Sequence, residues 1–189
     1  QMIEQLLPGL LIGIPILGST LPLALGLLRD RVGWTVAAVV LSIEAVLAGW
    51  LAYAIYVVGG HGERGIVHTL GGERFGRKSV ELATGETTQN FAVGIELVAD
   101  ELSALLVVLV AAVSLGVLGF ARQAGPRGNA FYSGYLLLAG GLMGLVLTGD
   151  LFNLFVFLEI VGLASYALIA GDQSADSAVA ALKYLVIGT

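Results

Sequence analysis

The sequence predicts an all-α, polytopic transmembrane helix bundle of about six spans, the last of them truncated, and three observations predict it. The 189 residues are 57% hydrophobic. Only 12% are charged, against about 25% in soluble domains. Long apolar runs also recur along the whole chain, with short polar segments between them. A chain with so little polar surface cannot form a water-soluble globule, so we treat 1–189 as one transmembrane domain.

Six apolar runs define the expected spans. A helix rises about 1.5 Å per residue, so roughly 20 residues cross the hydrocarbon core. The last run is shorter than this, and we expect a truncated sixth helix in a piece of a larger protein. The polar segment 59–96 is predicted to be an extramembrane loop; a short hairpin is allowed there, but the pattern fixes no strand. The expected spans are 6–28, 34–58, 97–121, 131–148, 150–170 and 175–189.

Several local signals refine this arrangement. Three prolines in the first run predict a bent helix, because proline breaks the helical hydrogen-bond ladder. The link Thr148–Asp150 is so short that the fourth and fifth helices must be antiparallel neighbours. Small residues in the fourth run predict close helix packing. The prolines are Pro8, Pro15 and Pro22, and the small residues are Gly140, Gly141 and Gly144.

Basic residues in the short loops predict the orientation. Arg29, Arg31, Arg122 and Arg127 fall on one side, which the positive-inside rule makes cytoplasmic. The N-terminus and the 59–96 loop are then outside, in a multi-pass protein of the cell membrane. Four basic residues oppose this assignment, but they lie in a longer loop mixed with acids and receive less weight. These are Arg64, Arg74, Arg77 and Lys78.

Glu159 is the most informative residue, because it lies in the middle of the fifth apolar run. A charged carboxylate at the centre of a membrane helix costs about 2.5 to 3.5 kcal/mol, so such a group indicates a partner or a function. Proton or ion transfer is the first function to consider. The alternative is a protonated carboxyl bonded to a neighbouring helix. Tyr166 lies on the same helical stripe and could extend a hydrogen-bonded path, and we expect Glu159 to face protein rather than lipid.

Two further charged residues lie within apolar runs. Lys183 in the sixth run is a candidate proton carrier or a modulator of a nearby acid. Alternatively, it extends to the cytoplasmic surface, on the stripe that it shares with Asp176. Glu44 lies inside the second run and must find a partner in the bundle. Its role could be conduction or the fixing of helices, and we favour the second as an accessory function.

The remaining polar residues predict structural roles. Asp100 and Asp150 open the third and fifth helices, where an acid caps free N–H groups. His61 and His68 have no acid at metal-ligand spacing and are predicted to be solvated. The chain has no cysteine, which excludes disulfides and thiol chemistry. With a net charge of −5 and no basic patch, we expect no nucleic-acid partner.

The segments TGDLFNLFVFLEIVGLASYALIA and AALKYLVIG, at 148–170 and 180–188, are closely similar to the D subunit of Mrp-type multisubunit cation/proton antiporters. The antiporter-like subunits of respiratory complex I and of membrane-bound hydrogenases belong to the same family. The opening of the third run, GIELVADELSALLVVL, also resembles it. The resemblance implies that Glu159 matches a glutamate that works in proton translocation and that Lys183 matches a lysine of the sixth helix. The family's later helices would lie beyond Thr189.

The expected function is therefore that of a proton-translocating subunit of a multisubunit Na⁺/H⁺ antiporter, a transporter subunit rather than an enzyme. Expected partners are the other subunits of the complex, H⁺, Na⁺ and the lipid bilayer, and we expect no metal or organic cofactor. One alternative is a proton-pumping subunit of a quinone-reducing or hydrogen-evolving complex. A second alternative is a structural membrane scaffold that moves nothing.

Overall fold

The computed structural model of the chain describes residues 2–28, 32–59, 65–70, 94–124, 128–171 and 175–188. Most of the basic residues that predicted the orientation lie outside these ranges. They are Arg29, Arg31, Arg64, Arg74, Arg77, Lys78 and Arg127, and His61 also lies outside. The elements are α1 Met2–Gly18, α2 Leu21–Gly26, α3 Gly33–Tyr53, the π-helical turn η1 Ala54–Val58, β1 Ile66–Leu70, β2 Ile95–Ala99, α4 Glu101–Gln123, α5 Asn129–Leu147, α6 Leu151–Ala170 and α7 Ala175–Gly188.

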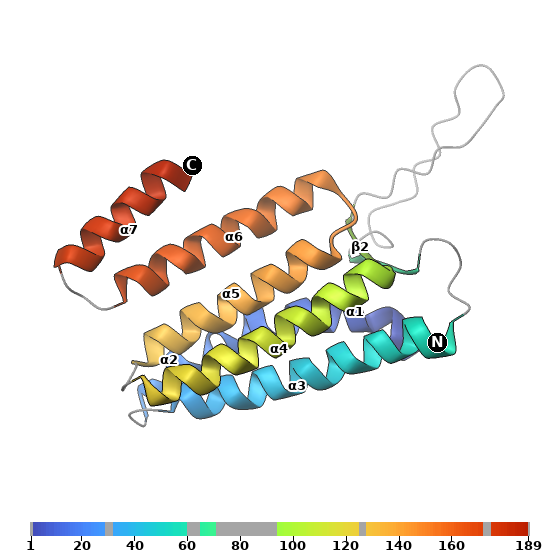
Figure 1. Ribbon diagram of the computed structural model, residues 1–189, viewed down its shortest axis with the longest axis horizontal. Coiled ribbons are helices and arrows are strands. Elements are labelled where there is room, and N and C mark those ends of the chain that lie inside the picture. Colours follow the sequence, from blue (N-terminus) through green and yellow to red (C-terminus); the bar gives the residue numbers. More distant parts are fainter. Residues whose placement is uncertain are drawn as a thin grey trace, which may run out of the picture.

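Five helical segments of the described chain are long and apolar enough to cross a membrane: Leu6–Gly26, Gly33–Val58, Glu101–Gln123, Asn129–Leu147 and Leu151–Ala170. Their presence confirms the predicted fold class. The helices α3 to α7 lie side by side with their axes roughly aligned (Figure 1). The 14-residue α7 packs against α6 at the edge of the bundle.

The first span is divided where the sequence predicted a bend. α1 ends at Gly18, and α2 starts three residues later, at Leu21, with Pro22 in its first turn. Ser19 Oγ donates a hydrogen bond to the carbonyl of Ile16 at 2.6 Å, and Thr20 Oγ1 donates one to the carbonyl of Leu17 at 2.8 Å. The same two carbonyls accept backbone hydrogen bonds of only 3.3 Å from the N–H groups of Ser19 and Thr20, so the hydroxyls add a second partner where the α-helical ladder is broken. Pro8 and Pro15 stay inside α1.

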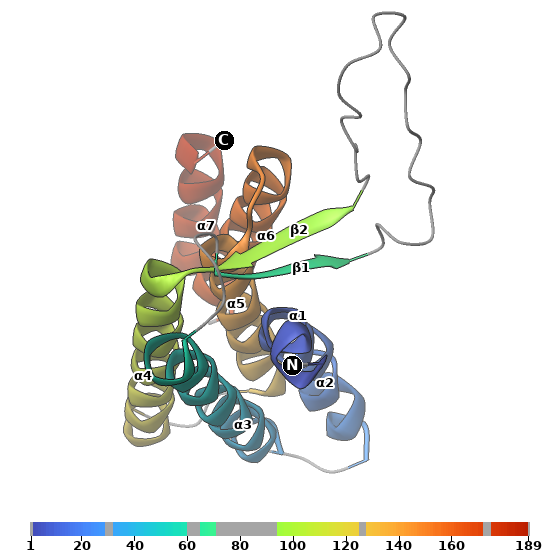
Figure 2. The ribbon, with the colours of Figure 1, turned by 90° about the vertical axis from the view of Figure 1, so that its right-hand side faces the viewer.

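The predicted start of the third span at Leu97 is wrong, because 95–99 form strand β2 and α4 begins at Glu101. β2 pairs antiparallel with β1, from Ile66 opposite Ala99 to Leu70 opposite Ile95. Leu97 and Ala99 are buried on one face of the strand, an alternation that a helix would not produce. Part of the predicted 59–96 loop is therefore a hairpin, which lies across one end of the helices (Figure 2).

α5 lies at the centre of the bundle and packs against α1, α3, α4 and α6. Its glycines allow these close approaches. An added Cβ at Gly140 would lie 2.7 Å from Ile16 Cγ1, and one at Gly141 would lie 2.9 Å from Val161 Cγ2. Both distances are shorter than side chains tolerate. The predictions of tight packing by this helix and of neighbouring α5 and α6 are confirmed.

The buried core forms two clusters along the helix axes. The hairpin-end cluster contains Leu7, Leu11, Ile12, Ala48, Leu51, Ile66, Leu97, Ala99, Val107, Ala111, Met143, Leu147 and Phe157. The Trp34-end cluster contains Ala37, Val40, Leu41, Leu118, Tyr132, Tyr135, Leu136 and Ala139, with Trp34 packed against it. At that end the Arg122 guanidinium lies 4.2 Å from the centre of a Trp34 ring, a cation–π contact.

Candidate functional site

α6 is the apolar helix that carries Glu159, and its start is fixed by a side-chain cap. Asp150 takes the N-cap position, where its carboxylate accepts a hydrogen bond of 2.8 Å from the backbone N–H of Asn153. The side-chain amide of Asn153 donates to the same carboxylate. Asp100 caps α4 in the same way, accepting 2.7 Å from the N–H of Ser103. Both acids serve as caps, the role predicted from the sequence.

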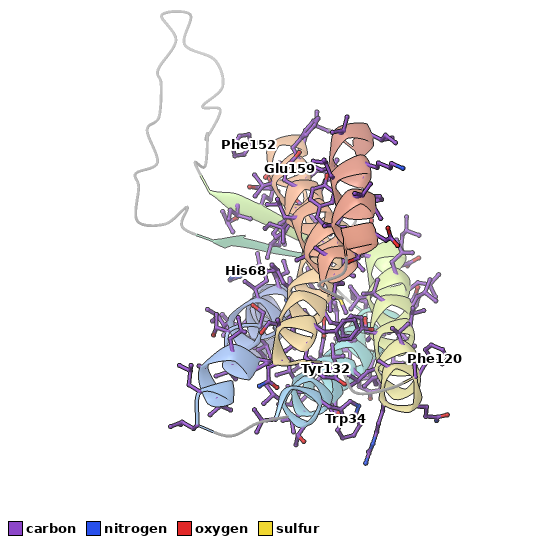
Figure 3. The ribbon with its side chains drawn as sticks, turned by 90° about the vertical axis from the view of Figure 1, so that its left-hand side faces the viewer. Trp34, His68, Phe120, Tyr132, Phe152 and Glu159 are labelled. Atoms are coloured by element: carbon purple, nitrogen blue, oxygen red, sulfur yellow. The ribbon has the colours of Figure 1, made fainter. Side chains whose placement is uncertain are left out.

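Glu159 lies on the side of α6 that faces away from α5 (Figure 3). The buried side of the helix is formed by Asn153, Phe157 and Ala164. Because successive helical residues turn by about 100°, Glu159 lies roughly 200° around the helix from Phe157. Its side chain is exposed within this chain. Phe157 and Ala164 occupy the side of α6 against α5, and the expectation that Glu159 faces protein stays a prediction.

Tyr166 lies on the same side of α6 as Glu159, two turns further along, and contacts α7. Its ring packs edge-on against Tyr184, with the ring centres 5.3 Å apart. The Tyr166 hydroxyl lies 3.5 Å from where a Cβ would stand on Gly162, and 3.2 Å from the same position on Gly188. Gly162 is one helical turn from Glu159. Tyr166 therefore brings a hydroxyl back along the helix toward the carboxyl, between α6 and α7.

Lys183 is exposed, as Glu159 is. The residue after it, Tyr184, is the one that contacts α6, so Lys183 lies about 100° around α7 from that contact. Asp176 lies seven residues earlier on the same stripe and is exposed as well. In the described part of the chain no ion pair joins Lys183 to an acid.

Glu44 has the opposite setting, inside the bundle. Its side chain is 1% exposed, and neither carboxyl oxygen has a hydrogen-bond partner among the described residues. It lies on the buried stripe of α3 with Ala37, Leu41 and Ala48. Sequence reasoning required a partner for Glu44 in the bundle, and the described side chains do not supply one. The sequence pattern of α3 identifies its buried side, but it could not show that Glu44 has no hydrogen-bond partner there.

Metal-ligating side chains do not gather anywhere in the described ranges, where no three of His, Cys, Asp or Glu form a group. His68 lies on β1 opposite Leu97. The membrane acids Glu44 and Glu159 stand on different helices, one inside the bundle and one on its surface. The chemistry that this arrangement offers is the binding and release of protons at carboxyl groups.

No family model matches the chain. Over 102 residues it is 53% identical to the N subunit of NADH-quinone oxidoreductase from Desulforudis audaxviator (strain MP104C), an alignment that covers 51% of this chain and 20% of that protein. Over 97 residues it is 42% identical to the D subunit of a Na(+)/H(+) antiporter from Alkalihalophilus pseudofirmus, covering 50% of this chain and 20% of that protein. The chain thus spans about a fifth of the length of these curated relatives.

Two solved structures share the fold over almost the whole chain. A chain of the Mrp complex from Dietzia sp. DQ12-45-1b matches with a TM-score of 0.74 and 27% identity, covering 99% of this chain and 32% of that one. A chain of the membrane-bound sulfane sulfur reductase, an archaeal respiratory membrane complex, matches with a TM-score of 0.69 and 25% identity, covering 95% and 33%. The predicted resemblance to antiporter and respiratory membrane subunits is confirmed.

Proposed function

We propose that this chain is part of a proton-translocating subunit of a multisubunit cation/proton antiporter, in which Glu159 binds and releases the transported proton. The observation that carries the proposal is the position of Glu159. It stands eight residues after Leu151 in the 20-residue apolar α6, or about 12 Å into the helix. Its side chain is exposed on the side of α6 opposite the contact with α5.

The cost of the carboxyl supports a functional role. An ionised acid at this depth costs about 2.5 to 3.5 kcal/mol, and Phe155 and Val156 beside it on the helix are apolar and exposed. A leucine would remove the cost entirely. The proton that neutralises Glu159 is released when a positive charge approaches and is taken up when that charge withdraws, because the Coulomb energy between them is large in a low-dielectric medium.

We assign Lys183 to the same transport function as a second membrane charge on the neighbouring helix. It does not face Glu159, so the two do not act as a direct pair in this arrangement. Tyr166 is the nearer accessory group, because its hydroxyl lies between Gly162 and Gly188 on the way to Glu159. A phenol can both donate and accept a hydrogen bond, which proton transfer along a path requires.

The proposed setting is the cell membrane, in a complex with other subunits that exchanges H⁺ for Na⁺. The exposed side chain of Glu159 would lie against further protein in that complex. The end with Trp34 and Arg122 would be cytoplasmic and the β1–β2 hairpin outside, by the positive-inside rule. The chain itself would act as a transporter subunit and carry out no bond-making chemistry.

The experiment is the substitution Glu159→Gln in the complete complex, expressed in cells that lack their own antiporters. Glutamine keeps the shape and removes the titration, so we expect loss of salt resistance with normal assembly. Asp176→Asn is the matched control, because it also removes one exposed acid but stands at the start of α7. Wild-type resistance with Glu159→Gln would overturn the proposal, and loss of resistance in both variants would show that the effect is not specific to Glu159.

A second candidate is a proton-pumping subunit of a respiratory complex, and the 53% identity to the N subunit of a NADH-quinone oxidoreductase favours it. Both candidates use Glu159 in the same way. The purified complex separates them: proton uptake driven by an imposed Na⁺ gradient supports the antiporter, whereas proton pumping that requires an electron donor and a quinone supports the respiratory complex. A scaffold would show neither flux, and its assembly would survive replacement of Glu159 and Lys183 by glutamine.

A further inference from the structure

Glu44 is the one described side chain whose two carboxyl oxygens are both buried without a partner. An unsatisfied buried polar atom is destabilising, and an uncompensated buried charge is more so. No lysine or arginine is among the buried described residues. A proton is therefore the charge that neutralises this carboxyl. An apolar residue of similar size would avoid the whole cost, so the acid serves something other than stability.

Its position is near the middle of the second apolar span, at the boundary between the two core clusters. Glu44 lies 11 residues after Gly33 and 14 before Val58 in the second span. On its own helix, Leu41 belongs to the Trp34-end cluster and Ala48 to the hairpin-end cluster. On α4 the same boundary falls at Ser114, which is also buried. Glu44 and Ser114 thus form a polar layer between two apolar ones.

On the hairpin side of this layer the buried positions of the helices that carry Glu44 and Ser114 are apolar until Ser103, in the first turn of α4. The apolar residues are Ala48 and Leu51 on α3, Ala54 in η1, and Ala104, Val107 and Ala111 on α4. Aliphatic side chains close this direction to proton movement, because they offer no donor or acceptor.

The opposite side of the layer carries polar groups from α5. The hydroxyl of Tyr135 donates a 2.7 Å hydrogen bond to the carbonyl of Ser114, the other member of the polar layer. One turn away, Tyr132 reaches Gly33, where an added Cβ would lie 2.6 Å from its ring. The N–H of Gly33 donates 2.9 Å to the side-chain oxygen of Asn129. Hydrogen-bonding groups are therefore present between the level of Glu44 and the Trp34 end of the bundle.

We propose that Glu44 is a second proton-binding site, which exchanges its proton with the Trp34 end of the bundle through Tyr135. The ligand is a proton held on a carboxyl, and the site does not depend on the function proposed for Glu159. The helices packed on α3 add few other titratable groups. Among the described side chains, α1 and α2 have none, α4 has Glu101 and Arg122 at its ends, η1 has Tyr56, and α5 has Tyr132 and Tyr135.

The test is infrared spectroscopy of the complete complex in lipid vesicles, which detects the C=O stretching band of a protonated carboxylic acid. We expect this band in the wild type and in Glu159→Gln, its loss in Glu44→Gln, and a shifted band in Glu44→Asp. Transfer to D₂O should move the Glu44 band as the proton exchanges. If Glu44→Gln leaves every carboxylic-acid band in place, the site does not hold a proton. If the band does not respond to D₂O, the proton is a fixed structural one, and the proposal fails.

The route is tested by two matched variants. Tyr135→Phe removes a hydroxyl that bonds a backbone carbonyl beside Glu44, and Tyr56→Phe removes one that donates 2.7 Å to the carbonyl of Glu101 at the hairpin end. We expect Tyr135→Phe to slow deuterium exchange of the Glu44 band several-fold and Tyr56→Phe to leave it unchanged. Equal rates in both variants would overturn the route. If Glu44→Gln does not assemble, Glu44→Asp tests the site instead, and we expect its carboxylic-acid band to be shifted. A band at the wild-type position in Glu44→Asp would contradict the proposal that Glu44 holds the proton.

Discussion

The ring of Phe157 on α6 lies directly over the Cα of Gly144 on α5, so closely that a Cβ at position 144 would overlap the ring. Through this contact α6 packs against α5. The opposite side of α6, which carries Glu159, faces away from α5. The placement of the candidate site therefore depends on a glycine in a different helix.

Gly144→Ala should destabilise the protein, because the added methyl group must displace Phe157 and with it α6. Overpacking of this kind costs about 1 to 3 kcal/mol. The measurement is the thermal stability of the purified complex, followed by loss of the assembled species on heating. Gly119→Ala is the control, since nothing lies within 4 Å of a Cβ at that position in α4. A melting temperature lowered equally by both substitutions would contradict the role of the contact.

Asp100→Asn should reduce stability at neutral pH but not in acid. The N–H of Ser103, which donates to the Asp100 carboxylate, holds the pKa of that carboxyl below its usual value. A lowered pKa in the folded state gives stability that is present above the ordinary Asp pKa of about 3.9 and is lost as the pH falls through the lowered value. Asparagine still caps the helix but carries no charge. Melting curves of both proteins at pH 7 and near pH 3 check this, and a difference that persists in acid would rule out the charge as its cause.

Two introduced cysteines should report the orientation, because the chain has no cysteine of its own. Val67→Cys on β1 and Gln123→Cys at the end of α4 both replace exposed side chains at opposite ends of the bundle. We expect a membrane-impermeant maleimide to label Val67→Cys in intact cells and Gln123→Cys only in inverted vesicles. The reverse pattern would place the hairpin in the cytoplasm and refute the positive-inside assignment.

Arg122→Gln should loosen the Trp34 end of the bundle. The guanidinium over the Trp34 ring stabilises by about 0.5 to 1 kcal/mol at an exposed site, and the Trp34 indole N–H donates 3.4 Å to the carbonyl of Leu118. A slightly lower melting temperature and altered tryptophan fluorescence are expected, with Arg122→Lys intermediate. Unchanged fluorescence of Trp34 in the glutamine variant would show that the contact does not persist in solution.

The sequence predicted the membrane helices well. Whether a segment can cross the bilayer depends on its own length and hydrophobicity, which are local properties of the sequence. The sequence analysis wrongly assigned Leu97 to the third helix. The two alternating buried residues of β2 continue directly into an apolar helix, and the partner strand β1 lies about 30 residues earlier in the chain. A pairing at that distance leaves no local signal beyond the alternation itself. The cap at Asp100 marks the true start of the helix.

The site residues were predicted by type but not by environment. A carboxyl in an apolar run is visible in the sequence, yet Glu159 and Glu44 look alike there. Which side of each helix is covered depends on contacts between distant segments, such as Phe157 on Gly144 or Tyr135 on Ser114. Only the assembled bundle separates the exposed acid on α6 from the buried one on α3.

The most direct measurement is cation-driven proton exchange by the complete complex in sealed vesicles, recorded with a fluorescent pH indicator for the wild type and for Glu159→Gln. We predict that the wild type and Asp176→Asn dissipate an imposed pH gradient on addition of Na⁺, and that Glu159→Gln, assembled to the same level, does not. Exchange at the wild-type rate in Glu159→Gln would contradict the central claim that this carboxyl carries the proton.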